Sequence, residues 1–378
     1  MLNKIFILLL ICYFVSLQVF GKDNFKFSFL GGPGYTSDEG FFIGASVLTT
    51  FSTDTEDSDL RRSVIPLVFG YLFTGGADAR IRPQLFFNKD NFRIFGEIFI
   101  FNAIKHYYGV GEEKTSSTER GETTTKYRNI SYKLNPIFLF RFRSTNIFIG
   151  TTLDLSYEEL TDLSEGVRND PDYIEMSGDS DEFSFYNTGL GINIIYDTRD
   201  IPANAYKGLL LEFKVTKYNR LIGSTFDFTV YEALYKQFKE LKFLGKRKIL
   251  AWMLNSRFST GDVPITQLST LGSPFDFRGY HVGHHRDRNI IYTLLEYRHM
   301  FNAGDSTKFR KLLSRFGYVI WGGLASMSHE IGKWSNALPN YGIGLRFETQ
   351  PRMNFRLDLG VDPTTNDFLL YFNMTEAF

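Results

Sequence analysis

The stretch PFDFRGYHVGHHRDRN, residues 274 to 289, gathers most of the residue types in this chain that could bind or react. It holds an arginine–glycine–tyrosine triplet, three histidines and further charged residues, namely Arg278, Gly279, Tyr280, His281, His284 and His285. Histidines can bind zinc, but structural zinc sites usually add cysteine or spaced carboxylates, and here Arg286 and Arg288 lie beside them. The composition therefore predicts a hydrogen-bonded loop, with a zinc site as the alternative, and we predict no metal site.

Other reactive patterns are missing from the sequence. The 378 residues include 42 Lys and Arg and 42 Asp and Glu, and this charge balance argues against a general nucleic-acid binder. The sequence has no Gly-x-Ser-x-Gly elbow, His-Glu-x-x-His pair or phosphate loop, so we predict no enzyme and no cofactor. The acidic segment 160–182 could bind divalent cations, but it lacks EF-hand spacing and is predicted to be a solvated surface loop.

The first residues, MLNKIFILLLICYFVSLQVFG, predict export. Lys4 precedes a short apolar run, and small residues follow, which is typical of a secretory signal peptide over 1–21 cleaved near Gly21. An N-terminal anchor helix is the alternative. The single cysteine, Cys12, lies in this segment, so the mature domain over 22–378 is expected to have neither disulfides nor thiol chemistry.

Long stretches with a period of two must position the arginine-rich loop. In MNFRLDLGV, residues 353–361, apolar side chains alternate with Asn354, Arg356, Asp358 and Gly360. Similar strands of about ten residues recur, whereas strands in soluble proteins are nearer five or six. Aromatic residues make up 17% of the chain, with 39 Phe and 21 Tyr. This pattern predicts an all-β fold, a transmembrane antiparallel β-barrel with its polar face toward the lumen.

The strand count is about sixteen, an even number that is typical of a bacterial outer-membrane barrel with both termini in the periplasm. The long connections 104–125, 160–182, 261–287 and 328–338 are all assigned to the outer side. The connections NKD, STN and TQP are assigned to the periplasmic side. Two connections on that side, 52–61 and 302–312, are longer than usual. The predicted location is the outer membrane, with its lipids as partners.

With the strands placed, residues 269–301 resemble the signature of the bacterial surface antigen superfamily, the BamA-type outer-membrane assembly factors. In that family an Arg-Gly-Phe/Tyr triplet lies on an outer loop that folds back into the barrel, and the next strand carries a carboxylate. The resemblance implies that loop 261–287 enters the lumen and that Arg278 pairs with Glu296. A guanidinium left unpaired there would be costly. The following strand has Trp321 and no acid, so we expect one carboxylate partner, with Trp321 supplying a cation–π contact.

Other segments agree with the resemblance. IIYDTRDIPANAYKGLLLEF, residues 194–213, is similar to the family's turn motif, with Asp197, Arg199 and Asp200 as the matching residues. The chain ends in a pattern that resembles the C-terminal signal read by the barrel-insertion machinery, formed by Leu370, Phe372, Met374 and Phe378. Glu376 departs from this pattern, because an aromatic or apolar residue is usual there.

The resemblance implies a role in the assembly, insertion or translocation of proteins or lipids at the outer membrane. We expect no POTRA domain before the first strand, and hence a separate periplasmic or lipoprotein subunit as a partner. The first strand contains Gly31, Gly32, Pro33 and Gly34. These residues weaken pairing and favour an opening seam, or else form a bend before pairing begins. A passive or gated channel and a structural or interaction barrel are the alternative functions.

Overall fold

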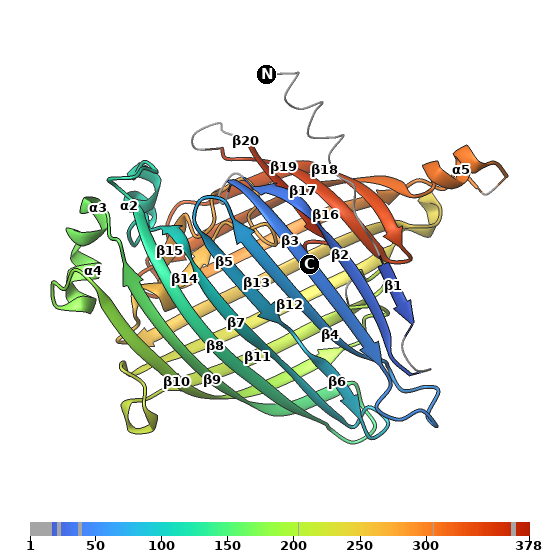
Figure 1. The fold of residues 1–378 in the computed structure, drawn as a ribbon, viewed down its shortest axis with the longest axis horizontal. Coiled ribbons are helices and arrows are strands. Elements are labelled where there is room, and N and C mark those ends of the chain that lie inside the picture. Colours follow the sequence, from blue (N-terminus) through green and yellow to red (C-terminus); the bar gives the residue numbers. More distant parts are fainter. Residues whose placement is uncertain (1–16, 21–23, 37–39, 203, 305, 364–367) are drawn as a thin grey trace.

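The computed structural model describes residues 17–20, 24–36, 40–202, 204–304, 306–363 and 368–378, and these residues form an antiparallel β-barrel (Figure 1). The wall strands are β2 (Lys26–Thr36), β3 (Gly40–Phe51), β4 (Ser63–Leu72), β5 (Gly76–Ile81), β6 (Gln84–Phe87), β7 (Phe92–His106), β8 (Lys126–Arg141), β9 (Ile147–Thr161), β10 (Phe183–Asp197), β11 (Gly208–Tyr218), β12 (Phe228–Glu240), β13 (Lys248–Gly261), β16 (Asn289–Met300), β17 (Phe316–Ser328), β18 (Leu338–Gln350), β19 (Met353–Val361) and β20 (Phe368–Met374).

The expected number of strands agrees with this wall. The main sheet has 18 strands, of which β1 (Leu17–Phe20) pairs with β2 alone among the described residues. Strands β5 and β6 both pair with β4 and β7, so they are two parts of one position in the wall. The described strands thus occupy sixteen positions around the barrel. Strands β5 and β6 are separated at Arg82 and Pro83 because proline cannot donate a ladder hydrogen bond.

The remaining elements lie in connections between wall strands. They are α2 (Glu112–Ser117), α3 (Glu165–Arg168), α4 (Pro171–Ser177), α5 (Lys308–Leu313), the 3₁₀ turns η1 (Arg220–Ile222), η2 (Lys242–Leu244) and η3 (Ile265–Gln267), and the short strands β14 (Ser269–Leu271) and β15 (His285–Asp287). Among the described residues, none of the helices is long and apolar enough to cross a membrane.

The wall strands separate polar and apolar side chains as the alternation predicts. On β10, Leu190 and Ile192 are 58% and 61% exposed on the outer face, whereas Asn187 and Asn193 are buried on the inner face. Because successive side chains of a strand point to opposite faces, each strand presents apolar side chains to the lipid and polar side chains to the lumen. The burial pattern of β9 alternates in the same way.

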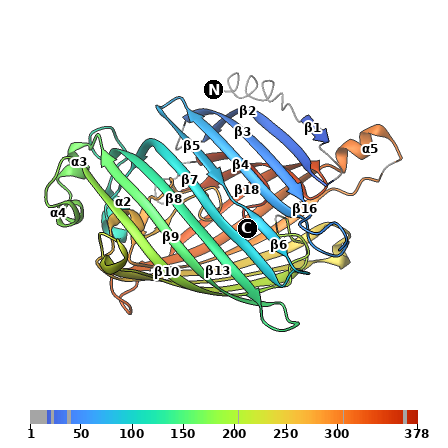
Figure 2. The same cartoon turned by 60° about the horizontal axis from the view of Figure 1, so that its bottom comes forward.

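The connections differ in length at the two ends of the barrel. The connections that carry α2, α3, α4 and the β14–β15 hairpin share one end, which we call the long-loop end (Figures 1 and 2). The connections 88–91, 142–146 and 351–352 lie at the other, short-turn end. Strand β2 starts at this end and β20 finishes there, because the strands alternate in direction.

The barrel closes weakly between β2 and β20. Strand β2 pairs with β3 along its whole length, so residues 31–34 lie inside a paired strand and do not form a bend before pairing. On the other edge of β2, the one registered pair with β20 among the described residues joins Thr36 to Tyr371. Strand β1 covers Lys26–Phe29 of that edge. Strand β1 lies within the predicted signal peptide, whose other residues fall outside the described ranges.

Candidate functional site in the barrel lumen

The connection between β13 and β16 folds back along the inner wall. Strands β14 and β15 pair from Ser269↔Asp287 to Leu271↔His285, and this hairpin presents the segment 272–284 to the wall. Helix α2, from the connection between β7 and β8, covers the hairpin, and the Gly111 N–H donates to the Arg286 carbonyl at 2.9 Å. Phe277 and Tyr280 are buried in an apolar cluster with residues of β13, β16 and β17. The folded-in loop expected over 261–287 is therefore present.

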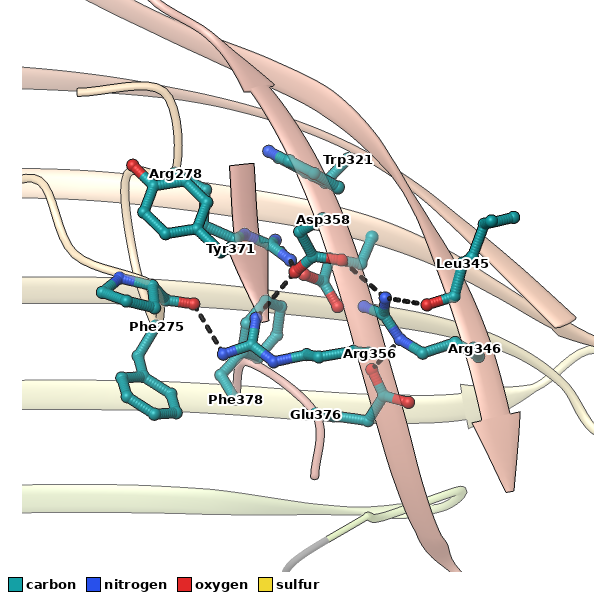
Figure 3. A network of polar contacts seen from close by, with 12 residues as sticks. Phe275, Arg278, Trp321, Leu345, Arg346, Arg356, Asp358, Tyr371, Glu376 and Phe378 are labelled. Carbon is teal, nitrogen blue, oxygen red and sulfur yellow. Dashed lines mark hydrogen bonds and ion pairs between the residues drawn. The ribbon is translucent and has the colours of Figure 1, made fainter. Parts of the chain in front are cut away.

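Arg278 is fully buried among side chains from three strands (Figure 3). Its guanidinium donates to Glu296 of β16 and to Asp358 of β19, the latter at 2.8 Å. Its Cζ atom lies 3.8 Å from the centre of the Trp321 ring on β17. The expected contacts with Glu296 and Trp321 are thus both found. Since a guanidinium is planar, two carboxylates can bind its edge while an aromatic ring covers its face.

The expectation of a single acidic partner for Arg278 is wrong. The next strand, β17, has no acid, but Asp358 reaches Arg278 from β19. Asp358 also accepts from Arg346 at 2.6 Å and from Arg356 at 2.7 Å. The alternation had placed Arg356 and Asp358 on an inner face. Their meeting with Arg278 depends on how far the loop reaches around the wall, which strand periodicity does not specify.

Gly279 and Tyr280 fix the backbone of the loop against β18, β19 and β20. Gly279 has φ +132°, and a Cβ atom there would overlap the Val361 carbonyl oxygen. The Tyr371 hydroxyl of β20 accepts from the Gly279 N–H at 3.3 Å and donates to the Tyr280 carbonyl at 3.0 Å. The Asn340 side chain donates to the Arg278 carbonyl at 2.6 Å. The triplet is therefore held through its main chain as well as its side chains.

The last residues of the chain join the same network. After Thr375, which has φ +67°, the chain turns away from β20 into the lumen. Glu376 accepts from Arg346 at 2.9 Å and from Asn354 at 2.6 Å. Arg298 of β16 donates to the terminal Phe378 oxygen at 2.8 Å and to Glu296 at 2.9 Å. Arg298 thus connects the carboxylate beside Arg278 to the end of the chain.

This tail changes the interpretation of the C-terminal pattern. Leu370, Phe372 and Met374 alternate with the buried Leu369 and Tyr371 of β20, so they lie on the outer face. Phe378 does not continue that face. It is buried with Phe238 and Ile249 in the lumen. The position of Glu376 has a structural reason, because its carboxylate binds Arg346. That the four residues form an insertion signal remains a prediction.

The turn motif lies at the short-turn end. Arg199 donates twice to Asp197, both at 3.0 Å. Asp200 accepts from the Tyr206 N–H at 3.0 Å and from Arg352, in the β18–β19 turn, at 3.1 Å. The guanidinium of Arg352 covers the Tyr206 ring at 3.3 Å. The motif therefore stabilises the β10–β11 connection and links it to the β18–β19 turn.

The histidines take part in hydrogen bonds within the loop. His285 Nδ1 lies 3.0 Å from Thr115 Oγ1 of α2, and His284 Nε2 lies 2.9 Å from the Thr115 carbonyl. Arg120 contacts His281 at 2.9 Å. Burial lowers the pKa of His285 to about 3, with the neighbouring His284 adding to the shift. Within the described ranges, no group of three or more histidine, cysteine or acidic residues is placed to hold a metal ion.

Solved structures with similar folds share this barrel. BamA from Haemophilus ducreyi lacking POTRA domains 1-3 is 13% identical, with a TM-score of 0.59, over 96% of this chain and 74% of that chain. CdiB from Escherichia coli is 10% identical, with a TM-score of 0.57, over 96% of this chain and 67% of that one. CdiB from Acinetobacter baumannii is 12% identical, with a TM-score of 0.54, over 94% of this chain and 60% of that one.

The family follows from the sequence match. No curated protein sequence matches the chain. Residues 81–378 match the Omp85 superfamily domain, and this range contains the lumen loop, Glu296, Trp321 and Asp358. The resemblance to BamA-type barrels is therefore confirmed, and the protein is a transmembrane β-barrel of the outer membrane. The chain belongs to the Omp85 superfamily.

Proposed function

We propose that this barrel assembles, inserts or translocates proteins at the outer membrane by opening its wall between β2 and β20. The observation that carries the proposal is the single registered pair, Thr36↔Tyr371, at this seam among the described residues. By contrast, β9 and β10 pair continuously from Phe183↔Leu160 to Tyr196↔Ile147. An unpaired strand edge is a template for an incoming strand, so an open seam offers a client backbone partners.

The predicted signal peptide adds to this proposal. Strand β1 covers Lys26–Phe29 on the seam edge of β2. Cleavage near Gly21 would remove β1 and free these backbone groups. Pro33 cannot donate a ladder hydrogen bond, which further weakens the edge. We also propose that both termini face the periplasm and that a separate periplasmic or lipoprotein subunit delivers the client.

A lumen held shut by the loop argues against the alternative of an open channel. Arg278, Glu296 and Asp358 are all fully buried, and the tail and the apolar cluster occupy the lumen beside them. Planar-bilayer recordings are expected to show low conductance. Steady conductance of the size that open barrels give would favour the channel instead.

A disulfide across the seam tests the proposed function. Extending the register of Thr36↔Tyr371 places Pro33 opposite Met374, so the variant is Pro33→Cys with Met374→Cys in a Cys12→Ser background. The control, Leu357→Cys with Phe372→Cys, crosses a registered pair of β19 and β20. Proteoliposomes carrying each variant receive a urea-unfolded eight-stranded barrel, and its insertion is measured by heat-modifiable mobility in gels.

We expect the oxidised seam variant to lose insertion activity and to regain it after reduction, whereas the oxidised control stays active. Full activity with the seam locked would overturn the proposal. If neither variant nor the unmodified protein inserts the barrel, while lipid or protein crosses the bilayer through the unmodified protein, translocation replaces insertion as the function.

A further inference from the structure

Two neighbouring connections at the short-turn end carry a concentrated positive charge. Residues 241–248, LKFLGKRK, hold four basic and no acidic residues, and residues 306–316, STKFRKLLSRF, also hold four basic and no acidic residues. Glu240 precedes the first segment and Asp305 the second. We call the exposed cations of these segments the basic rim: Lys242, Lys246, Lys308, Arg310, Lys311 and Arg315.

The two segments form one surface. Strands β13 and β16 are paired, so the β12–β13 and β16–β17 connections are neighbours on the rim. Arg247 joins them directly, because its guanidinium donates to the Ser314 carbonyl at 2.7 Å. In both ribbon views, α5 projects sideways from the end of the barrel beside the connection that contains η2 (Figures 1 and 2).

The cations of the basic rim are available to bind an external partner. Among the described residues, no carboxylate forms an ion pair with any of the six basic-rim side chains, whereas Arg247 in the same region pairs with Glu348 at 2.7 Å. Large apolar side chains are exposed between the cations: Phe243 is 81% and Phe309 is 72% exposed, and Leu312 is 49% exposed. Contact of two phenylalanine side chains with water is unfavourable, whereas the same side chains are stabilised when they are buried in a membrane interface.

Aromatic side chains on the adjacent outer wall indicate where the bilayer ends. His299 of β16 stacks on Tyr318 of β17 at 4.8 Å between ring centres, and Phe316 contacts Phe347 at 5.0 Å. Such rings form the girdle at the interface of a transmembrane barrel. Four residues of the basic rim, Lys308, Arg310, Lys311 and Arg315, lie in the connection between these ends of β16 and β17, which places them at headgroup depth.

The opposite part of the same end has the reverse charge. Residues 52–61, STDTEDSDLR, connect β3 to β4 and carry Asp54, Glu56, Asp57 and Asp59. The two sectors of this end therefore differ in the sign of their net charge, which general solubility would not require. Charge complementarity selects an anionic surface, and each Lys or Arg near such a surface strengthens binding about fivefold.

We propose that the basic rim binds anionic glycerophospholipid headgroups in the leaflet at the short-turn end, while Phe243 and Phe309 insert among the acyl chains. This anchor fixes the β12–β17 sector of the wall to the bilayer. The seam lies elsewhere, between β2 and β20, so it stays free to move relative to the anchored sector. The proposal does not depend on insertase activity.

The test uses full-length protein with Cys12→Ser and Ser306→Cys, labelled at residue 306 with an environment-sensitive dye. The protein is placed in nanodiscs of phosphatidylcholine with one fifth phosphatidylglycerol, in which one lipid or the other carries bromine as a quencher. We expect brominated phosphatidylglycerol to quench the dye at least threefold more than its share of the lipid predicts. Moderate salt should reduce this preference.

Two variants and a control assign the effect to the basic rim. The triple change Lys308→Gln, Arg310→Gln and Lys311→Gln should abolish the preference for phosphatidylglycerol. The double change Phe243→Ser and Phe309→Ser should keep the preference but shift the dye emission toward that in water. The control Lys217→Gln with Lys333→Gln removes exposed cations at the long-loop end and should change neither readout.

Equal quenching by the two brominated lipids in the unmodified protein would overturn the proposal. The same holds if the dye stays in a water-like environment in every nanodisc. If the triple variant keeps the lipid preference and instead loses binding to a polyglutamate peptide, the basic rim is a docking surface for an acidic protein and the lipid proposal is wrong.

Discussion

The inner face of β20 and its edge toward β2 are held very differently. On the inner face, Tyr371 binds the backbone of the lumen loop through both Gly279 and Tyr280, next to a network of buried charges. Along the edge, one registered pair joins β20 to β2 within the described residues. The loop thus anchors β16–β20 from inside, while the wall remains weak beside them. The contacts that dock the loop and the seam that we propose to open therefore lie on the inner face and on the edge of the same strand.

Replacing Arg278 by alanine should give the largest loss of stability. Glu296 and Asp358 would lose a shared partner in a buried site, which costs about 3–5 kcal/mol. Urea unfolding in lipid vesicles, followed by heat-modifiable gel mobility, measures the change. Arg82→Ala is the matched control, because the Arg82–Glu97 pair lies 2.8 Å apart on a half-exposed part of the wall. The control should lose less than about 1 kcal/mol. Equal losses would show that the loop does not anchor the wall.

Asp358→Asn should cost about 3 kcal/mol, since it removes the charge that three guanidinium groups share. The same unfolding assay applies. Limited proteolysis should also cut the loop 272–284 faster than in the unmodified protein. Unchanged proteolysis together with lowered stability would assign Asp358 to the wall alone and not to docking of the loop.

Gly279→Ala should destabilise the docked loop by about 2 kcal/mol, because φ +132° is strained for alanine and its methyl group would meet the Val361 carbonyl. Gly283→Ala is a control in the same loop. Gly283 also has positive φ, +67°, but the nearest group to its added methyl is the Arg286 side chain at 3.7 Å. Its expected cost is about 1 kcal/mol. A larger effect at Gly283 than at Gly279 would contradict the close approach to β19.

Lowering the pH should weaken the outer part of the loop through His285. Its folded pKa of about 3 lies below the unfolded value, so the unfolded chain binds the proton more readily. The stabilisation is present above pH 6.5 and is lost as the pH falls toward 3, by about 1–2 kcal/mol at pH 5. Urea midpoints at pH 7.5 and pH 5 measure this change. His285→Gln should flatten the dependence, and an unchanged slope in that variant would assign it to other groups.

Pro33→Ala at the seam should have the smallest effect, within about 0.5 kcal/mol of the unmodified stability. Within the described ranges the seam edge of β2 has one registered pair with β20, so restoring one N–H should leave the unfolding midpoint nearly unchanged. Stabilisation above 1 kcal/mol in the same assay would mean that the two edges pair more fully than the single register pair implies.

Particular residues show how far the sequence could predict the site. The alternation separated the polar face of the strands from the apolar face, and the triplet motif identified Arg278 as the residue of the loop that needs a carboxylate, with Glu296 as the partner that the resemblance implies. The same alternation placed Arg356 and Asp358 inward, so a signal for the second carboxylate was present. It could not be used, because periodicity shows which face a residue occupies but not which strand the loop reaches.

The sequence by itself determined the β-barrel, the inner and outer face of each strand, and the single arginine loop, because these depend on a local period of two and on short motifs. Only the tertiary structure decided that Asp358 binds Arg278, that Glu376 and Phe378 turn inward, and that one registered pair joins β2 to β20 among the described residues. These features require strands far apart in the chain to meet around a closed wall. The relative positions of these strands are set by the curvature and register of the whole barrel, which no local sequence pattern specifies.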